Sequence, residues 1–225
     1  MRATTHLLGK DVSLVKLALL PLTIATLMAT SCTRSGDLVA GGVYTKRTGC
    51  PQVAIPGATG DITLFDPAGN TTAAAIDVVA TITNLRSTCT EDTQNLVSTA
   101  TFDVVATRRN PTSARQVVLP FYSVAVQGGT AVVAKKVGAV ALNFPAGSVR
   151  ARTNSQSTVR VTRSAAALPE EVRRELTRER KAGDPNAAVD PLSDPKIRDA
   201  VARATFEHLV GFQLTGEQLR YNATR

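Results

Sequence analysis

Hydrophobic and polar residues alternate along much of the chain between residues 50 and 163, and this alternation predicts β-strands. It is clearest at 76–85 and 96–107, where apolar side chains take every second position and mainly threonine or aspartate lies between them. A period of two with many β-branched residues is typical of half-buried antiparallel strands. A polar segment separates the two runs, so we expect them to form a hairpin or a sandwich pair.

Further apolar runs predict additional strands. They lie at 62–65, 116–127, 131–144, 148–153 and 157–163. Pro120 suggests a sheet edge or a bulge, because proline donates no backbone hydrogen bond. Gly128 and Gly129 predict the tight turn of a hairpin, and Gly138 is expected to break the strand that follows. No alternation of strands with helices points to a parallel sheet.

The periodicity changes after residue 164, and three helices are expected. Pro169 and two glutamates open the first, which should run to about residue 182 before Gly183 stops it. The second is expected at 195–210, with a broad apolar stripe, and a short third near 217–222. We therefore expect residues 165–225 to form a helical extension that packs on the β-domain.

Three aspartates lie between the first two expected helices, and each precedes a proline: Asp184, Asp190 and Asp194. Their spacing does not match a calcium-binding loop. Turn and helix-capping roles explain them better, with Asp194 as the cap of the second helix. We expect no metal site.

The N-terminal region differs from the rest of the chain. Residues 1–16 are weakly basic, and an unbroken apolar run of 12 residues follows at 17–28. Such a run fits a signal peptide and is short for a membrane-spanning helix, which needs about 20 residues. The sequence therefore predicts a signal peptide over 1–31 and export of the remainder.

The end of that run carries a resemblance to a known class. Ala29-Thr30-Ser31-Cys32 resembles the lipobox of bacterial lipoproteins, although such motifs usually carry leucine where this chain has Ala29. The resemblance implies that Cys32 is acylated, for instance with palmitate, and anchors the protein in a lipid bilayer. Residues 32–48 then form the anchor site and a flexible tether, and Thr33 favours the periplasmic face of the outer membrane. An ordinary cleaved signal and an uncleaved anchor or cytosolic protein are the alternatives.

The two remaining cysteines, Cys50 and Cys89, both lie in the part expected to be exported. An even pair in an exported chain predicts a structural disulfide. The chain has no Cys-x-x-Cys sequence that would suggest redox chemistry.

The expected β-domain spans 49–164. The segment VVATRRNPT (104–112), followed by VVLPFYSVAV (117–126), is similar to immunoglobulin-like or fibronectin-III-like modules. The resemblance implies an antiparallel immunoglobulin-like β-sandwich. We therefore expect a mainly β fold with C-terminal helices.

The composition argues against most catalytic chemistry. The chain holds two histidines, three cysteines and no tryptophan. His208 falls in the expected second helix beside apolar residues, which favours a structural role over that of a base in a nucleophilic triad. No phosphate-binding glycine motif is present, and the few aromatic residues disfavour a sugar-processing cleft. We expect no catalytic residue and no cofactor, while a hydrolase that uses carboxylates alone stays open as a weaker alternative.

Basic residues form the one patterned surface signal in a chain of net charge +8. Five arginines are candidates for contacts to an anionic ligand, since their forked donors suit phosphate and carboxylate groups. They are Arg150, Arg152, Arg160, Arg173 and Arg174. The alternative is a solvated strand face and a salt-bridged helix. We do not expect nucleic-acid binding, because export removes that partner and stacking residues are few.

Together these features predict a non-enzymatic lipoprotein of the bacterial cell envelope that serves as a structural or protein-interaction module of an envelope complex. The alternative is a periplasmic module that binds lipid or lipopolysaccharide in a groove between the β-domain and the helices.

Overall fold

The computed structural model describes residues 49–179, 181, 183, 185 and 188–224, together with the backbone of residues 38–39 and 42–43. The chain divides into two compact units, Met1–Thr45 and Lys46–Arg225. In the first unit, β1 (Leu38–Val39) pairs antiparallel with β2 (Gly42–Val43). The predicted signal peptide, Cys32 and most of the predicted tether lie outside the described residues.

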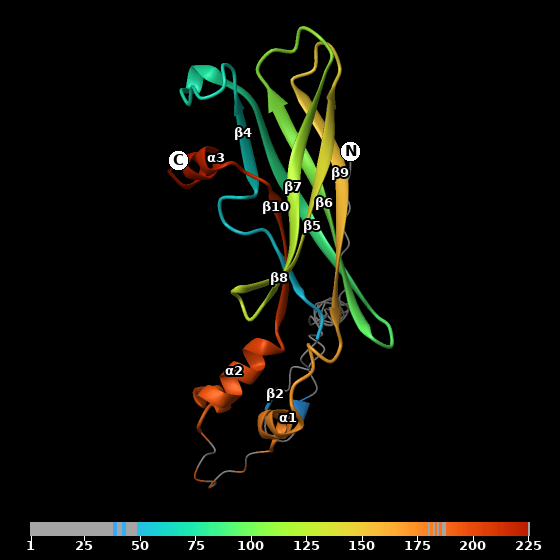
Figure 1. The fold of residues 1–225 in the computed structure, drawn as a ribbon, viewed down its shortest axis with the longest axis vertical. Coiled ribbons are helices and arrows are strands. Elements are labelled where there is room, and N and C mark those ends of the chain that lie inside the picture. Colours follow the sequence, from blue (N-terminus) through green and yellow to red (C-terminus); the bar gives the residue numbers. More distant parts are fainter. Residues whose placement is uncertain are drawn as a thin grey trace, which may run out of the picture. The chain divides into compact units, whose positions relative to one another are not determined.

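Two four-stranded sheets make up the second unit (Figure 1). Sheet I has the order β4-β5-β6-β9, and all of its neighbouring strands run antiparallel. Its strands are β4 (Asp61–Phe65), β5 (Ile76–Glu91), β6 (Asn95–Arg108) and β9 (Arg150–Thr162). A short 3-10 turn, η1 (Ala73–Ala75), precedes β5.

Sheet II has the order β3-β10-β7-β8. Its strands are β3 (Gln52–Ala54), β10 (Phe206–Phe212), β7 (Arg115–Gln127) and β8 (Ala131–Phe144). Only the short β3 pairs in parallel within this sheet, with β10; the other pairs are antiparallel. The structure therefore confirms a mainly β fold of largely antiparallel strands with short C-terminal helices.

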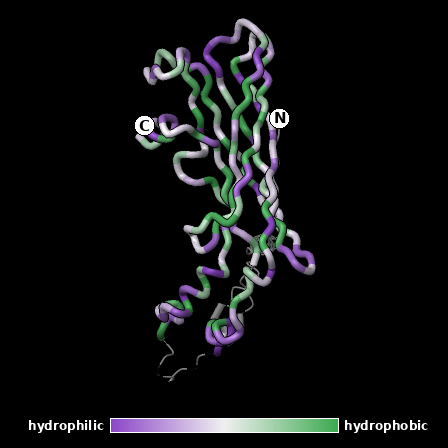
Figure 2. Tube along the Cα trace, viewed as in Figure 1, coloured by the Kyte–Doolittle hydropathy of each residue, from purple (hydrophilic) through white to green (hydrophobic). Residues whose placement is uncertain are grey.

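The core lies between the two sheets, where the inward faces of both contribute aliphatic and aromatic side chains. Phe102 of sheet I and Phe121 of sheet II meet edge to face, with their ring centroids 5.3 Å apart. Burial of such side chains is the main favourable term in folding. Figure 2 shows that hydrophobic segments follow the strands, whereas the tip of the β5–β6 hairpin is hydrophilic.

Most strand predictions are confirmed, with two differences in extent. The strand β8 continues through Gly138, where a break was expected. A side chain at Gly138 would place its Cβ 2.7 Å from the ring of Phe121, so glycine serves here to admit that ring. The two short strands expected near 148–153 and 157–163 are one strand, β9, paired along its whole length with β6.

Pro120 lies in an interior strand, so the expected sheet edge is wrong for β7 as a whole. The expected bulge is also absent there, because the register shift falls at Ala125 and Val126. The Pro120 carbonyl accepts a hydrogen bond from the N–H of Gln213, one residue past the end of β10. Pro120 has no N–H to donate to the Gln213 carbonyl. Because Gln213 lies just past the end of β10, the sheet loses only one hydrogen bond at the end of that strand.

The predicted disulfide is confirmed. Cys50 and Cys89 are joined, with their Cα atoms 6.2 Å apart. Cys50 precedes β3 of sheet II and Cys89 lies in β5 of sheet I, so the bond links the two sheets covalently. Such a cross-link stabilises a fold mainly by restricting the unfolded chain.

The helical extension is shorter than expected. The first helix, α1 (Glu170–Thr177), begins as predicted but ends several residues earlier. A 3-10 turn, η2 (Pro191–Ser193), and α2 (Pro195–Arg203) follow, and α3 (Gly216–Thr224) matches the third predicted helix. Asp190 and Asp194 cap these elements as predicted, accepting hydrogen bonds from the backbone N–H groups of Leu192 and Lys196.

The expected helix over 195–210 is wrong in its second half. The chain leaves α2 after Arg203 and enters β10, which fills the middle of sheet II between β3 and β7. Alternate residues of β10 are buried in the core: Phe206, His208, Val210 and Phe212. The C-terminal segment therefore completes the β-domain instead of only packing on it.

Candidate functional site

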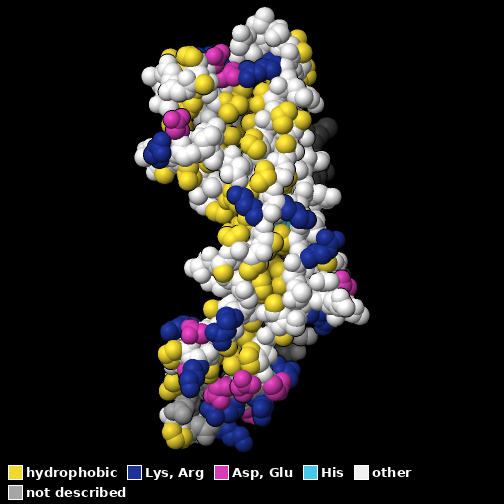
Figure 3. Space-filling view, viewed as in Figure 1, with side chains coloured by type: hydrophobic (Ala, Val, Ile, Leu, Met, Phe, Trp, Pro, Cys, Tyr) yellow, Lys and Arg dark blue, Asp and Glu magenta, His cyan; other side chains and the backbone are white. Residues whose placement is uncertain are grey.

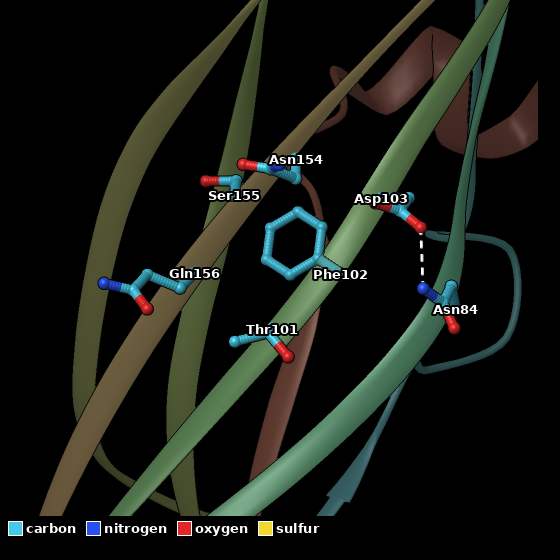
Figure 4. A pocket seen from close by; sticks show the side chains of 7 residues that line it. All are labelled: Asn84, Thr101, Phe102, Asp103, Asn154, Ser155 and Gln156. Atoms are coloured by element: carbon cyan, nitrogen blue, oxygen red, sulfur yellow. Dashed lines mark hydrogen bonds between the residues drawn. The ribbon is translucent and has the colours of Figure 1, made fainter.

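A hollow of about 590 Å³ opens on sheet I, between β5, β6 and β9 (Figure 4). Its lining is mostly amide, hydroxyl and carboxylate groups: Asn84, Thr101, Phe102, Asp103, Asn154, Ser155 and Gln156. The cross-strand register explains the grouping, since Asp103 pairs with Asn154 and Thr101 with Gln156. Cross-strand partners on one face lie side by side.

Asn84 reaches this hollow because β5 is irregular at that point. The β5–β6 register shifts between Thr83 and Arg86, and Asn84 has a φ of 51°. Asparagine tolerates this left-handed conformation better than most residues. The irregularity aims the Asn84 side chain at Asp103, to which its Nδ2 donates a hydrogen bond of 2.7 Å.

Asp103 is the charged centre of the hollow and is largely buried. The amide of Asn84 and then the guanidinium of Arg152, 2.6 Å away, hold the pKa of this carboxyl below its usual value. Asp103 is therefore an ionised acceptor at neutral pH and is poorly suited to donate a proton. This arrangement orders the hollow and offers no support for a pair of facing catalytic carboxylates.

A second hollow, of about 560 Å³, lies on the same sheet. Its lining consists of Val79, Thr81, Val105, Ala106, Thr107, Arg150, Ala151 and Arg152. The two hollows are neighbours along β6 and β9, because the Val105–Arg152 pair is two register positions from the Asp103–Asn154 pair and is therefore the next pair on the same face. Within the described chain, the Arg150 guanidinium forms no ion pair or hydrogen bond.

The structure brings together two of the five predicted arginines. Arg150 and Arg152 line the second hollow. Arg160 lies on the same strand opposite Val97, outside both hollows. Arg173 and Arg174 lie on α1, where both pair with Glu170.

His208 lies in β10, not in a helix, and is fully buried between the sheets. Its Nδ1 is 3.1 Å from Ser98 Oγ, and its Nε2 is 2.9 Å from Ser123 Oγ and 3.2 Å from Ser157 Oγ. Burial lowers the His208 pKa to about 4, so the ring is neutral at physiological pH. Because solvent does not reach the His208 ring, we interpret His208 and the three serines as a structural hydrogen-bond network.

A hollow of about 560 Å³ also lies between α1 and α2. Its apolar floor includes Val172, Ile197 and Ala200. Four carboxylates stand around it, those of Glu171, Glu175, Asp194 and Asp199, against the two cations of Lys196 and Arg203. This balance disfavours the phosphate groups of an anionic lipid.

The outer surface of sheet II is apolar where β7 meets β8. Three cross-strand pairs follow one another there: Val118–Ala141, Pro120–Ala139 and Tyr122–Val137. Val118 is 57% exposed and Val137 is 60% exposed. We call Val118, Pro120, Val137, Ala139 and Ala141 the apolar face. Figure 3 shows hydrophobic side chains along the middle of the visible surface, while charged side chains gather at the end that carries α1 and α2.

The edge of β8 next to this face has unpaired backbone groups. The Pro120 carbonyl points toward β10, away from β8. In an antiparallel pair, the backbone N–H and C=O groups of the two residues either bond to each other or both point away from each other. The N–H and C=O of Ala139, the partner of Pro120, therefore point away from β7. The same holds for Val137, Ala141 and Asn143, and no described strand pairs with that edge.

The sequence predicted β7 and β8 but not the apolar face. Which strand lies at a sheet edge depends on sheet order, and only the pairing of β10 with β7 leaves β8 outermost. The signal in the sequence that could have suggested the apolar face is that β7 and β8 are apolar on both faces. The residues at 118, 137, 139 and 141 are apolar although they alternate with the residues that face the core.

In the part of the chain that the structure describes, no helix is both long and apolar enough to cross a membrane. Comparison of the chain with protein-family models, with curated proteins and with solved structures finds no match in any of the three.

Proposed function

We propose that this protein is an exported, non-enzymatic lipoprotein of the bacterial cell envelope that binds another envelope protein by accepting an extended strand at the edge of β8. The observation that carries the proposal is the open edge of β8 beside the apolar face. Long apolar edge strands invite pairing with another chain, and strand addition at a sheet edge is a common mode of peptide recognition.

Export is supported by the Cys50–Cys89 disulfide, because such bonds persist in oxidising compartments. The lipobox-like segment supports acylation of Cys32, which would hold the protein at a bilayer, with the outer membrane as the proposed site. One acyl chain gives only marginal anchoring, whereas several anchor stably. A protein partner in the envelope is then within reach of the β-domain.

The anchor is tested by metabolic labelling with radioactive palmitate in a bacterial host. The wild-type chain is expected to take up label and to fractionate with membranes, and Cys32→Ala to lose both properties. Cys50→Ala with Cys89→Ala is the control that removes the other two cysteines and should leave the labelling unchanged. Equal, negligible labelling of wild type and Cys32→Ala, with both in the soluble periplasm, would contradict the anchor.

The edge of β8 indicates the chemistry of the partner strand. Lys135 and Lys136 are the only charged residues of β8. Neither forms a salt bridge with a carboxylate among the described residues; the Lys135 ammonium lies 5.8 Å from the ring centroid of Tyr122. Lysines on an edge strand deter pairing with ordinary neighbours. We therefore propose a partner segment that is extended, apolar at alternate positions and acidic where it meets these two lysines.

This proposal is tested with a synthetic strand peptide of alternating valine and glutamate, compared with the same peptide carrying lysine for glutamate. The full chain is expected to bind the acidic peptide and not the basic one. Ala139→Pro removes an N–H that faces outward, so it should weaken binding at least about tenfold while leaving the β7–β8 ladder intact.

The control is Ala139→Val, which keeps that N–H and should bind within about twofold of wild type. Circular dichroism and thermal unfolding establish that both variants are folded. Equal binding by Ala139→Pro and wild type contradicts the edge as the docking site. Concentration-dependent dimerisation that Ala139→Pro abolishes would instead assign the edge to a second copy of this chain.

Two features favour this function over lipid carriage. The space between the sheets is filled by core side chains, and the hollow between α1 and α2 is lined by carboxylates. A lipid would have to displace the core or place its phosphate among those acids. We also propose that the β-domain is an immunoglobulin-like sandwich, which is supported by two facing sheets of largely antiparallel strands.

A further inference from the structure

The two hollows of sheet I follow one another along β6 and β9, and we call the strip of surface that holds both of them the trough. It follows β9 from Gln156 to Arg150. Six residue steps along a strand cover about 20 Å. The surface is therefore long enough for an extended polymer and too long for a single small metabolite.

The lining of the trough is rich in hydrogen-bonding groups that carry no net charge. Amides come from Asn154 and Gln156, and hydroxyls from Thr101 and Thr107. Asn84 and Thr81 also line the surface, but their side chains already bond to Asp103 and Asp61. Such groups both donate and accept, as the hydroxyls of a sugar chain require. The strands hold them in fixed register, which limits the entropy lost on binding.

The floor of the trough is aliphatic in the second hollow. Val79 and Val105 lie between the polar groups on the outer face of the sheet, and Val105 is 37% exposed, whereas Ala151 packs against the core. Small apolar patches of this kind can contact the C–H faces of sugar rings. No aromatic ring is presented for base stacking, because the Phe102 side chain is buried in the core. The lack of an exposed ring disfavours a single-stranded nucleic acid, whose bases stack on aromatic side chains.

Two arginines and one aspartate line the trough, so cations outnumber anions in its lining. Arg152 is occupied by Asp103, whereas Arg150 lines the same hollow with no described partner. Arg86 lies beside Asn84 and donates to its Oδ1, adding a further cation near the other end. A guanidinium fork binds carboxylate or phosphate through two parallel hydrogen bonds.

We propose that the trough binds an extended acidic glycan, with an anionic group of the chain on Arg150 and its hydroxyls on the amides and threonines. The anion can be a sugar carboxylate or a phosphate, since both suit the same fork. This site lies on the sheet opposite to β8 and does not depend on strand addition there. The protein would then hold a partner on one sheet and an envelope polymer on the other.

The test is an isothermal titration of the full chain with four probes: an oligogalacturonate, a phosphorylated oligosaccharide, a neutral oligosaccharide of the same length, and inorganic phosphate. At least one acidic oligosaccharide is expected to bind at least about tenfold more tightly than the neutral one and than phosphate alone. The arm that binds identifies the anion as carboxylate or phosphate.

Two matched variants locate the binding. Arg150→Gln is expected to weaken binding of the acidic probe at least about tenfold. Arg160→Gln removes the same charge from the same strand outside both hollows and should change the affinity less than about twofold. Arg152 is left intact because its loss would also free Asp103. Asn154→Ala, which removes one amide from the lining without a change of charge, should weaken binding of acidic and neutral probes alike.

Several results would overturn the proposal. Equal loss with Arg150→Gln and Arg160→Gln would show general attraction to a basic surface. Equal binding of the neutral probe would show that the anion has no part, and equal binding of inorganic phosphate would show an adventitious ion only. Failure of all four probes to bind removes the site, whatever the outcome at β8.

Discussion

Replacing Arg108 with methionine is expected to lower the free energy of unfolding by about 4 kcal/mol. Arg108 is 5% exposed, and its guanidinium donates to four backbone carbonyl oxygens, those of Pro111, Ser113, Pro145 and Ser148. It also lies 5.0 Å above the ring of Phe144. Methionine keeps the apolar stem but removes all four guanidinium bonds, although the Pro111 and Pro145 carbonyls keep the bonds that they accept from the N–H groups of Gly147 and Ser148.

Arg108 stabilises the fold because it connects two loops. The four carbonyls belong to the loop between β6 and β7 and to the loop between β8 and β9, so one side chain joins two loops from both sheets. The buried charge is compensated by carbonyl dipoles, not by a carboxylate. Chemical denaturation monitored by circular dichroism measures the change.

Arg109→Met is the matched control for this prediction. Its side chain is exposed and donates one bond, of 3.2 Å, to the Ala73 carbonyl. We expect a change within about 0.5 kcal/mol for this variant. Arg108→Lys should fall between the two, because one ammonium cannot reach four separated acceptors. Similar stabilities for Arg108→Met and Arg109→Met would contradict the proposed role of Arg108.

The His208 cluster makes stability depend on pH. The folded-state pKa is lowered from 6.5 to about 4, so between these values the unfolded chain binds a proton that the folded chain does not. Stability is therefore full above about pH 6.5 and is lost as the pH falls toward 4, by about 3 kcal/mol in total. Denaturant titrations from about pH 7 to about pH 4 measure this loss.

His208→Gln isolates the contribution of the ring. Glutamine can bond to the neighbouring serines but does not titrate, so the difference in unfolding free energy between wild type and variant should shrink as the pH falls. Asp92 and Asp103 have lowered pKa values, so most of their contribution is lost below about pH 3.8, and the part lost above it is common to wild type and variant and cancels in the difference. A difference that stays constant with pH would show that His208 is not held neutral.

The strands were predictable because apolar residues occupy every second position on their inner faces. β5 and β6 each bury alternate residues against the opposite sheet, so this burial is visible in the sequence as an alternation of apolar and polar residues. β10 was missed because Phe206, Leu209 and Val210 also fit a helical spacing when joined to α2. A short apolar run does not distinguish the two periods, and pairing with β7 decides it.

The trough was predictable only in part. Arg150 and Arg152 share a face because they are two residues apart on one strand, which the sequence shows directly. Their meeting with Asn84 and Asp103 depends on the register of β5, β6 and β9 and on the irregularity at Asn84. Pairing and register across strands are tertiary properties. The sequence alone could not show that Arg173 and Arg174 lie outside the trough, because this depends on the position of α1.

The most direct test of strand addition at β8 is amide hydrogen exchange, followed residue by residue by NMR with and without the acidic strand peptide. The outward N–H groups of Val137, Ala139, Ala141 and Asn143 are expected to slow at least about tenfold when the peptide binds. Those of Gly138, Val140 and Leu142, which face β7, should change little. Bound peptide that leaves the four outward amides exchanging as fast as in the free protein would contradict the proposed function.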